Sequence, residues 1–255
     1  MNPSMVILEL KDEVATLTLN DSKNMNALGE QMIRELRNLI REINEMDEVR
    51  VVILVGAGGN FSAGGNLKEI LNFDSKTALN FHKILNEISY LMRHSSKIFL
   101  VGMEGYALGG GFEISLSADI RICSEGTILG QPEIGLGLNA GAGGNAILPR
   151  VVGRSNALYL ALTGRKITSS EAKNLNIIQK VVPEGKLLEE LHDLARDIIL
   201  LPPETVSLTK LCINSAIEAT AGTSLDMEAL AFSLLNTNKD VKQRIGKFFE
   251  EKNRK

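Results

Sequence analysis

Two glutamates of this chain stand almost alone among uncharged residues. Gly126 to Pro149 contain one charged residue, Glu133, and Ile98 to Ala118 contain only Glu104 and Glu113. Because 23% of the whole chain is charged, such segments are unusual. A carboxyl group among Gly, Leu and Ile is expected to be desolvated, which raises its pKa towards the range useful for proton transfer. We therefore expect Glu113 and Glu133 to form an acid/base pair.

Two glycine-rich segments follow apolar runs that are typical of buried strands. They are Phe61–Lys68 (FSAGGNLK) and Gly105–Glu113 (GYALGGGFE). Glycines at a strand-to-helix transition let backbone amides approach a ligand, and two amides converging on one oxygen make an oxyanion hole. The structural alternatives are tight turns for the glycines, a carboxylate complementing a helix dipole for Glu113, and a buried carboxylate satisfied by loop amides for Glu133.

The elements that must position these motifs alternate between strand and helix up to about residue 150. The expected strands cover residues 5–10, 14–20, 49–55, 98–103 and 120–123, and the expected helices cover 28–46, 76–93 and part of 109–117. The remainder is mostly helical, with helices over 156–162, 169–175, 184–200 and 204–219 and one strand near 177–182. Thr168 and Glu171 have the spacing of a capping box. The pattern predicts an α/β core followed by a helical C-terminal part.

Composition excludes several classes of protein. With 255 residues and 44% apolar residues, the chain can bury a full core. Its net charge of −3 gives no basic footprint for nucleic acid. Cys123 and Cys212 are read as buried apolar residues, and no metal site is expected. No apolar run approaches the ~20 residues of a membrane span, and the strand beginning at Met5 leaves no room for a signal peptide. We expect a cytoplasmic protein without a membrane partner.

In their order along the chain, the motifs resemble the enoyl-CoA hydratase/isomerase (crotonase) family over nearly its whole length. The matching segments are Lys23–Leu28, Phe61–Gly65, Gly105–Gly111, Gly130–Glu133, Gly141–Gly144, Leu148–Arg150, Leu162–Arg165 and Val181–Pro183. The resemblance implies an α/β fold, with a ββα spiral core over residues 1–195 and a helical C-terminal trimerisation region over 196–255. It also implies a homotrimer or dimer of trimers, and an acyl-CoA substrate whose coenzyme A replaces any separate cofactor.

The resemblance assigns roles to individual residues. Glu113 and Glu133, 20 positions apart (133 − 113), match the two glutamates that add water to a 2-enoyl-CoA to give a 3-hydroxyacyl-CoA. The amides of Gly65 and Gly110 match the oxyanion hole, and that of Gly141 matches one that helps to hold the reacting water. Ala63 matches an adenine-contacting position, and Lys23 and Lys68 match basic residues near coenzyme A. The full set of expected substrate-binding residues is Lys23, Met25, Ala27, Ala63, Gly65, Asn66, Leu67, Lys68 and Gly110.

The chain departs from the family pattern at several positions. Asn66 replaces the usual Asp, Asn139-Ala140 stands where a proline is usual, and Asn145 begins a run that replaces Thr-Gln-Arg. Without the proline we expect a less rigid loop. The alternative functions are a double-bond isomerase of the same family and a non-catalytic acyl-CoA-binding or RNA-binding member. Retention of both glutamates favours hydration, and the mixed charge of residues 239–255 favours a solvated helix over an RNA-binding one.

Overall fold

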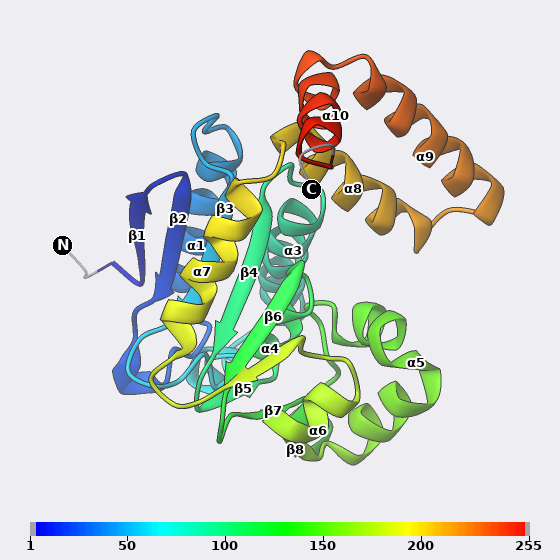
Figure 1. The fold of residues 1–255 in the computed structure, drawn as a ribbon. Helices are drawn as coiled ribbons and strands as arrows, with labels where there is room; N and C mark the ends of the chain where they lie inside the picture. The colour runs from blue at the N-terminus through cyan, green and yellow to red at the C-terminus, as the bar shows by residue number, and fades with distance from the viewer. Residues whose placement is uncertain (1–3, 253–255) are drawn as a thin grey trace. The chain divides into compact units, whose positions relative to one another are not determined.

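A six-stranded sheet forms the centre of the fold. The computed structural model describes residues 4–252, and the strand order in this sheet is β1-β2-β3-β4-β6-β9 (Figure 1). The hairpin partners β1 and β2 are antiparallel, and every later pairing is parallel. The strands are β1 (Val6–Lys11), β2 (Val14–Leu19), β3 (Val51–Gly56), β4 (Ile98–Met103), β6 (Ile120–Ser124) and β9 (Lys180–Val182).

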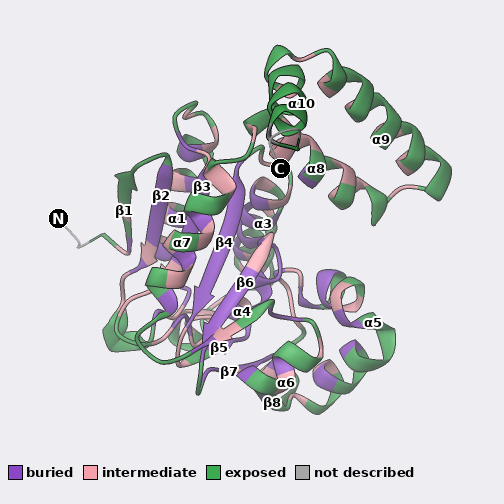
Figure 2. Ribbon diagram, viewed as in Figure 1, coloured by how far each residue is buried: buried purple, intermediate pink, exposed green. Residues whose placement is uncertain are grey.

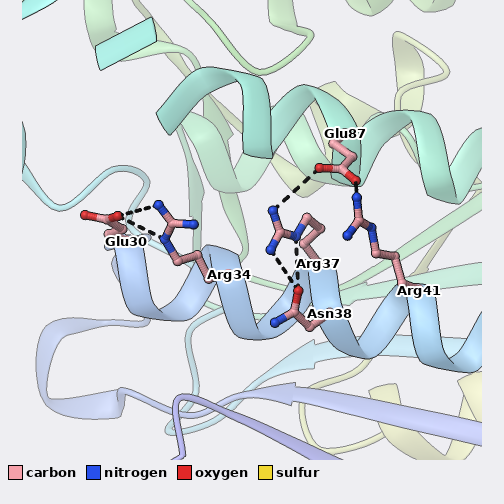
Figure 3. A network of polar contacts seen from close by, with 6 residues as sticks. All are labelled: Glu30, Arg34, Arg37, Asn38, Arg41 and Glu87. Atoms are coloured by element: carbon pink, nitrogen blue, oxygen red, sulfur yellow. Dashed lines mark hydrogen bonds and ion pairs between the residues drawn. The ribbon is translucent and has the colours of Figure 1, made fainter. Parts of the chain in front are cut away.

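Helices cover both faces of this sheet. Helices α1 (Glu30–Asn44) and α3 (Ser75–Arg93) lie side by side on one face, and α7 (Leu187–Ile199) lies on the other (Figure 1). Strands covered on both faces are continuous apolar runs, which is why β3 and β4 are recognisable in the sequence. Figure 2 shows the central strands as buried. Glu87 of α3 pairs with Arg37 and Arg41 of α1, joining the two helices at their outer surface (Figure 3).

A second, three-stranded sheet leads to the two isolated glutamates. Its strands are β5 (Tyr106–Leu108), β7 (Ile128–Gly130) and β8 (Lys166–Thr168), with β7 in the middle, parallel to β5 and antiparallel to β8. The chain leaves β5 into α4 (Gly110–Ser115) and leaves β7 into the 3₁₀ helix η2 (Pro132–Leu136). Glu113 and Glu133 lie in these two helices. Because β5 and β7 are adjacent and parallel, their carboxyl ends bring both glutamates to one place.

Shorter and bent helices complete the part of the chain that surrounds these two sheets. They are η1 (Ser22–Asn24), α2 (Leu67–Ile70), α5 (Gly144–Thr163) and α6 (Ser169–Asn174). The capping box predicted at the start of α6 is confirmed, since Thr168 and Glu171 bond to each other's backbone N–H. Helix α5 starts well before the expected residue 156 and is interrupted at Gly153, where φ is 77°.

The chain divides into two compact units, the first ending at Ala195 and the second beginning at Arg196. In the second, α8 (Pro203–Ala216) packs on α9 (Ala221–Asn236), and α10 (Lys239–Lys252) follows. The expected helix over residues 204–219 corresponds to α8, and the tail of 239–255 is helical up to residue 252, with 253–255 outside the described residues. Helix α9 lies in the region expected to be helical, but the sequence analysis gave no separate helix there.

The two cysteines lie in different surroundings. Cys123 of β6 is fully buried, and desolvation raises the pKa of its thiol to about 12. Cys212 of α8 is partly exposed, and both thiols are free. Within residues 4–252, no helix has the length and apolar character needed to cross a membrane.

Candidate active site

Glu113 is buried and held by backbone amides. It lies in the first turn of α4, and only 2% of its surface is exposed. Its Oε2 accepts hydrogen bonds from the N–H groups of Ala142, at 2.7 Å, and Gly144, at 2.8 Å. Such charge-assisted bonds are roughly twice as strong as neutral ones, so the loop before α5 fixes this carboxylate firmly. The sequence indicated Glu113, but not these two amides.

Glu133 has different surroundings. The pKa of its carboxyl group is raised to about 7, chiefly by burial and also by the charge and carboxyl group of Glu113, against a lowering by its own backbone N–H. Its Oε2 is buried and has no hydrogen-bond partner among the described residues. Near neutral pH, Glu133 therefore exists in both protonated and ionised forms. Two carboxyl groups whose surroundings differ in this way are suited to separate acid and base roles.

Gly109 brings the turn before α4 directly against Glu133. Its φ of 52° and ψ of −130° lie in a region that side chains rarely adopt. A Cβ at this position would also lie 2.8 Å from Oε1 of Glu133. The N–H of Gly109 donates to the carbonyl of Gly130 at 2.9 Å, which holds the ends of β5 and β7 together. The backbone conformation therefore calls for glycine, and a side chain here would crowd the carboxyl group of Glu133.

The predicted oxyanion-hole glycines are also neighbours. A Cβ at Gly110 would lie 3.9 Å from the backbone nitrogen of Gly65. Gly65 bridges to Leu28, whose N–H and carbonyl bond to Gly64 and Asn66. Among residues 4–252, no acceptor is found for the N–H of Gly65 or of Gly110. Both donors therefore remain available to a ligand beside the two carboxyl groups.

Comparison with known proteins identifies the family. The enoyl-CoA hydratase/isomerase family model matches residues 9–255. The chain belongs to the enoyl-CoA hydratase/isomerase family. It is 34% identical over 253 residues to the short-chain-enoyl-CoA hydratase of Clostridium acetobutylicum, covering 99% of this chain and 97% of the relative. It is 31% identical to the crotonyl-CoA hydratase of Syntrophomonas wolfei, covering 97% of this chain and 95% of the relative.

Solved structures confirm the predicted crotonase-like α/β fold. A crystal structure of an enoyl-CoA hydratase from Thermoplasma volcanium superposes with a TM-score of 0.91 at 35% identity, over 96% of this chain and 97% of that one. An enoyl-CoA hydratase from Bacillus anthracis gives a TM-score of 0.93 at 32% identity, over 97% and 96%. The expected family and its fold are therefore both established for this chain.

In this family member, the two segments expected to contact coenzyme A lie together. The N–H of Ala63 donates to the carbonyl of Met25 at 2.9 Å, joining residues 23–28 to 61–68. Met25 and Leu67 are exposed, as are Lys23 and Lys68. Asn66 is committed to structure instead: it caps α2 by accepting from the N–H of Lys68, and it donates to Glu69.

Gly141, another of the predicted residues, lies beside a histidine that the sequence did not indicate. A Cβ at Gly141 would be 2.5 Å from Cε1 and Nδ1 of His82, so the imidazole of α3 packs on this part of the loop. Gln131 was also missed: only 2% of it is exposed, and neither polar atom of its amide has a partner among the described residues. It lines a cavity of about 220 Å³ together with Glu133. Its position two residues before Glu133 was the available signal.

Proposed function

We propose that the protein is an enoyl-CoA hydratase, which adds water across the double bond of a 2-enoyl-CoA thioester to give a 3-hydroxyacyl-CoA. The observation that carries this proposal is the pair of neighbouring carboxyl groups in unequal surroundings. Glu113 is held by two N–H groups, and Glu133 has a pKa of about 7. The relatives named as short-chain-enoyl-CoA and crotonyl-CoA hydratases support the same reaction.

The amides of Gly65 and Gly110 bind the thioester oxygen. Attack of water on the β-carbon moves electrons onto that oxygen, giving an enolate. Two preoriented N–H donors stabilise this charge, and one such donor is typically worth about 3 kcal/mol. Withdrawal of electrons by the same donors makes the β-carbon more electrophilic before attack.

The glutamates move the two protons. Glu113, as carboxylate, accepts a proton from the water whose oxygen bonds to the β-carbon. Glu133, as carboxylic acid, donates a proton to the α-carbon as the enolate collapses to the thioester. The product gains one OH and one H, and the proton on Glu113 returns to Glu133 to reset the site. Gly141 lies in the loop whose amides, those of Ala142 and Gly144, bind Glu113, and its N–H helps to hold the reacting water.

Coenzyme A binds along the joined segments around Met25 and Ala63. Lys23 and Lys68 supply exposed positive charge for its phosphates, and Ala63 lies against the adenine. Residues Ala27 and Leu67 complete this surface. Coenzyme A is thus part of the substrate, and the chemistry assigned to the two glutamates needs no further cofactor.

The working form is a homotrimer or a dimer of trimers. Helix α9 has no buried residue, and the second unit exposes many large apolar side chains. They include Leu225, Leu230, Phe232, Leu234, Phe248 and Phe249. Exposed apolar area of this kind is typical of a surface that another subunit covers.

Loss of the enoyl-thioester absorbance of crotonyl-CoA tests the proposal. Glu113→Gln and Glu133→Gln should each lower kcat about 10²-fold or more, because a positioned acid or base contributes about 10²–10⁴. Glu104→Gln, in the same uncharged segment as Glu113, is the matched control and should retain activity. Near wild-type turnover by Glu133→Gln would refute its role, and conversion of 3-enoyl-CoA without hydration would indicate an isomerase instead.

A further inference from the structure

The loop that holds Glu113 is closed at its ends by two asparagine side chains. Nδ2 of Asn145 donates to Oδ1 of Asn139 at 2.7 Å, and Nδ2 of Asn139 donates to the carbonyl of Ala140 at 2.9 Å. We call these side chains the Asn clasp. Both residues are departures from the family pattern, and the clasp joins them where the chain lacks the usual proline. We propose that Asn139 and Asn145 are positioning residues that fix the amides of Ala142 and Gly144 on Glu113.

The loop needs such closure because of its composition. Residues 139–145 include Gly141, Gly143 and Gly144, and Gly143 adopts a φ of 112°. Glycine has more conformational freedom to lose on folding than any other residue, so this loop is costly to order. A bond between its ends removes part of that freedom before substrate binds.

The middle of the loop has separate support. The hydroxyl of Ser89 in α3 donates to the carbonyl of Ala142 at 3.3 Å, and the His82 imidazole packs on Gly141. Gln131 lies against Gly144, since a Cβ there would come 1.7 Å from its Nε2. These contacts hold the loop's backbone against α3 and the residue that follows β7. The chain before the loop is held by the bond from the N–H of Leu138 to the carbonyl of Glu133, and Asn145 lies in the first turn of α5. Among the described residues, the Asn clasp is the side-chain contact that joins the two ends, and it encloses both donors to Glu113.

The inference rests on the proposed function, in which Glu113 is the base. Both asparagines line the cavity that Gln131 and Glu133 also line, and the proposed effect acts through the loop rather than through contact with the substrate. Loosening the clasp leaves both N–H groups present but less well aimed, so the carboxylate is held less firmly during the reaction. The chemical step is then slowed, while coenzyme A contacts, made by other segments, are unchanged. We therefore expect kcat to fall and KM to stay constant.

Two isosteric variants test the direction of the hydrogen bond. Asn145→Asp removes the donor of the bond that joins the two side chains and places two acceptors face to face. Asn139→Asp keeps an acceptor for Asn145 and loses only the local bond from Asn139 to the carbonyl of Ala140. Both add the same charge at neighbouring positions. We expect Asn145→Asp to lower kcat about threefold to tenfold more than Asn139→Asp, the range that loss of one ordinary hydrogen bond produces. Equal losses would overturn the proposal.

Alanine variants test whether the two residues act as one device. Asn139→Ala, Asn145→Ala and the double variant should show similar kcat values, because either single change opens the clasp. Asn156→Ala, which removes a side-chain bond to the carbonyl of Val152 on the same helix, is the control and should keep wild-type kcat. If the kcat losses of the single variants multiply in the double variant, the two asparagines contribute independently and the proposal is wrong.

A readout without substrate separates this proposal from the assigned function. Hydrogen exchange measured by mass spectrometry on peptides covering residues 138–146 should be faster in Asn145→Ala at unchanged Tm. Asn145→Thr, whose hydroxyl can donate to Asn139, should restore part of the protection. Unchanged exchange in Asn145→Ala would refute the clasp even in an active enzyme. Faster exchange in a protein without hydratase activity would instead refute the function and leave the clasp standing.

Discussion

At the scale of single residues, different surroundings give the carboxyl groups of Glu113 and Glu133 different properties. The first has two N–H donors on one oxygen, and the second has a buried oxygen without a partner among the described residues. Both residues could be selected from the sequence because they interrupt long uncharged segments. The division into a base and an acid could not be predicted from the sequence. It depends on backbone amides, which almost every residue type carries, and on burial, which only the fold creates.

The rate of hydration should depend on the ionisation of Glu133. As the acid, it must be protonated, so kcat/KM should fall as pH rises through the pKa of about 7 of the free enzyme. A pH profile of kcat/KM with crotonyl-CoA checks this, and a value that stays level from pH 6 to about 9 would contradict it.

The same raised pKa affects stability. The folded state binds this proton more tightly than the unfolded chain, whose carboxyl has the ordinary value of 4.5. The contribution is therefore complete below that value and is lost as pH rises through about 7. Thermal unfolding of Glu133→Gln should match the wild type at low pH and show the higher Tm above pH 7, since the variant avoids a desolvated anion.

Gly109 should not tolerate a side chain. Gly109→Ala would strain a backbone at φ 52° and press its methyl group against Oε1 of Glu133. We expect at least a tenfold lower kcat and a stability loss of about 1–3 kcal/mol, typical of such strained conformations. Gly59→Ala is the control for a side chain at positive φ without a close neighbour, because its φ is 73° and a Cβ there meets nothing within 4 Å. Equal kcat losses in the two variants would argue against the contact with Glu133.

At the scale of elements, the main sheet and its covering helices follow from the sequence, and the rest follows only in part. Buried parallel strands are continuous apolar runs, and α1 has an apolar stripe of helical period. The strands β5, β7 and β8 are three residues each, too short to produce a pattern. The first half of α5 contains glycines and Pro149, which conceal a helix. The apolar residues of α9 lie all around the helix and form no single stripe. The sequence pattern therefore does not mark it as an amphipathic helix.

Helix α2 depends on an amide at its N-terminus. Asn66 donates to Oε1 of Glu69 at 2.8 Å, and Oε2 of the same carboxylate accepts the N–H of Glu30 at 2.8 Å. Asn66 thereby links the segment after Gly65 to the start of α1. Asn66→Asp would bring two carboxylates together, so we expect a lower Tm and about a threefold to tenfold lower kcat, as for loss of one hydrogen bond.

A second substitution tests whether Asn66→Asp acts through the lost hydrogen bond to Glu69 or through a contact with the substrate. In Asn66→Asp/Glu69→Gln the hydrogen bond is restored with donor and acceptor exchanged, so activity and Tm should recover. Failure of the double variant to recover would mean that Asn66 acts directly on the substrate.

At the scale of the whole molecule, we expect assembly into multiples of the chain mass. Light scattering should give a trimer of about 83 kDa (3 × 27.8) or twice that mass. Phe232→Glu, at a side chain that is 73% exposed, should shift the particle towards smaller species if another subunit covers it. Lys247→Glu, an exposed change in α10, controls for added charge. A particle of 27.8 kDa at micromolar wild-type protein would contradict the assembly.

Because the thiol of Cys123 is buried and that of Cys212 is partly exposed, alkylation of the unmodified chain can be used to detect unfolding. Alkylating reagents react with the thiolate, and Cys123 is both buried in strand β6 and, with a pKa of about 12, almost never ionised. Intact mass spectrometry should find at most one adduct on the folded protein, at Cys212, and two in denaturant. Each second adduct then counts an event in which the main sheet opened. The rate of its appearance would measure the kinetic lifetime of the core without any introduced label.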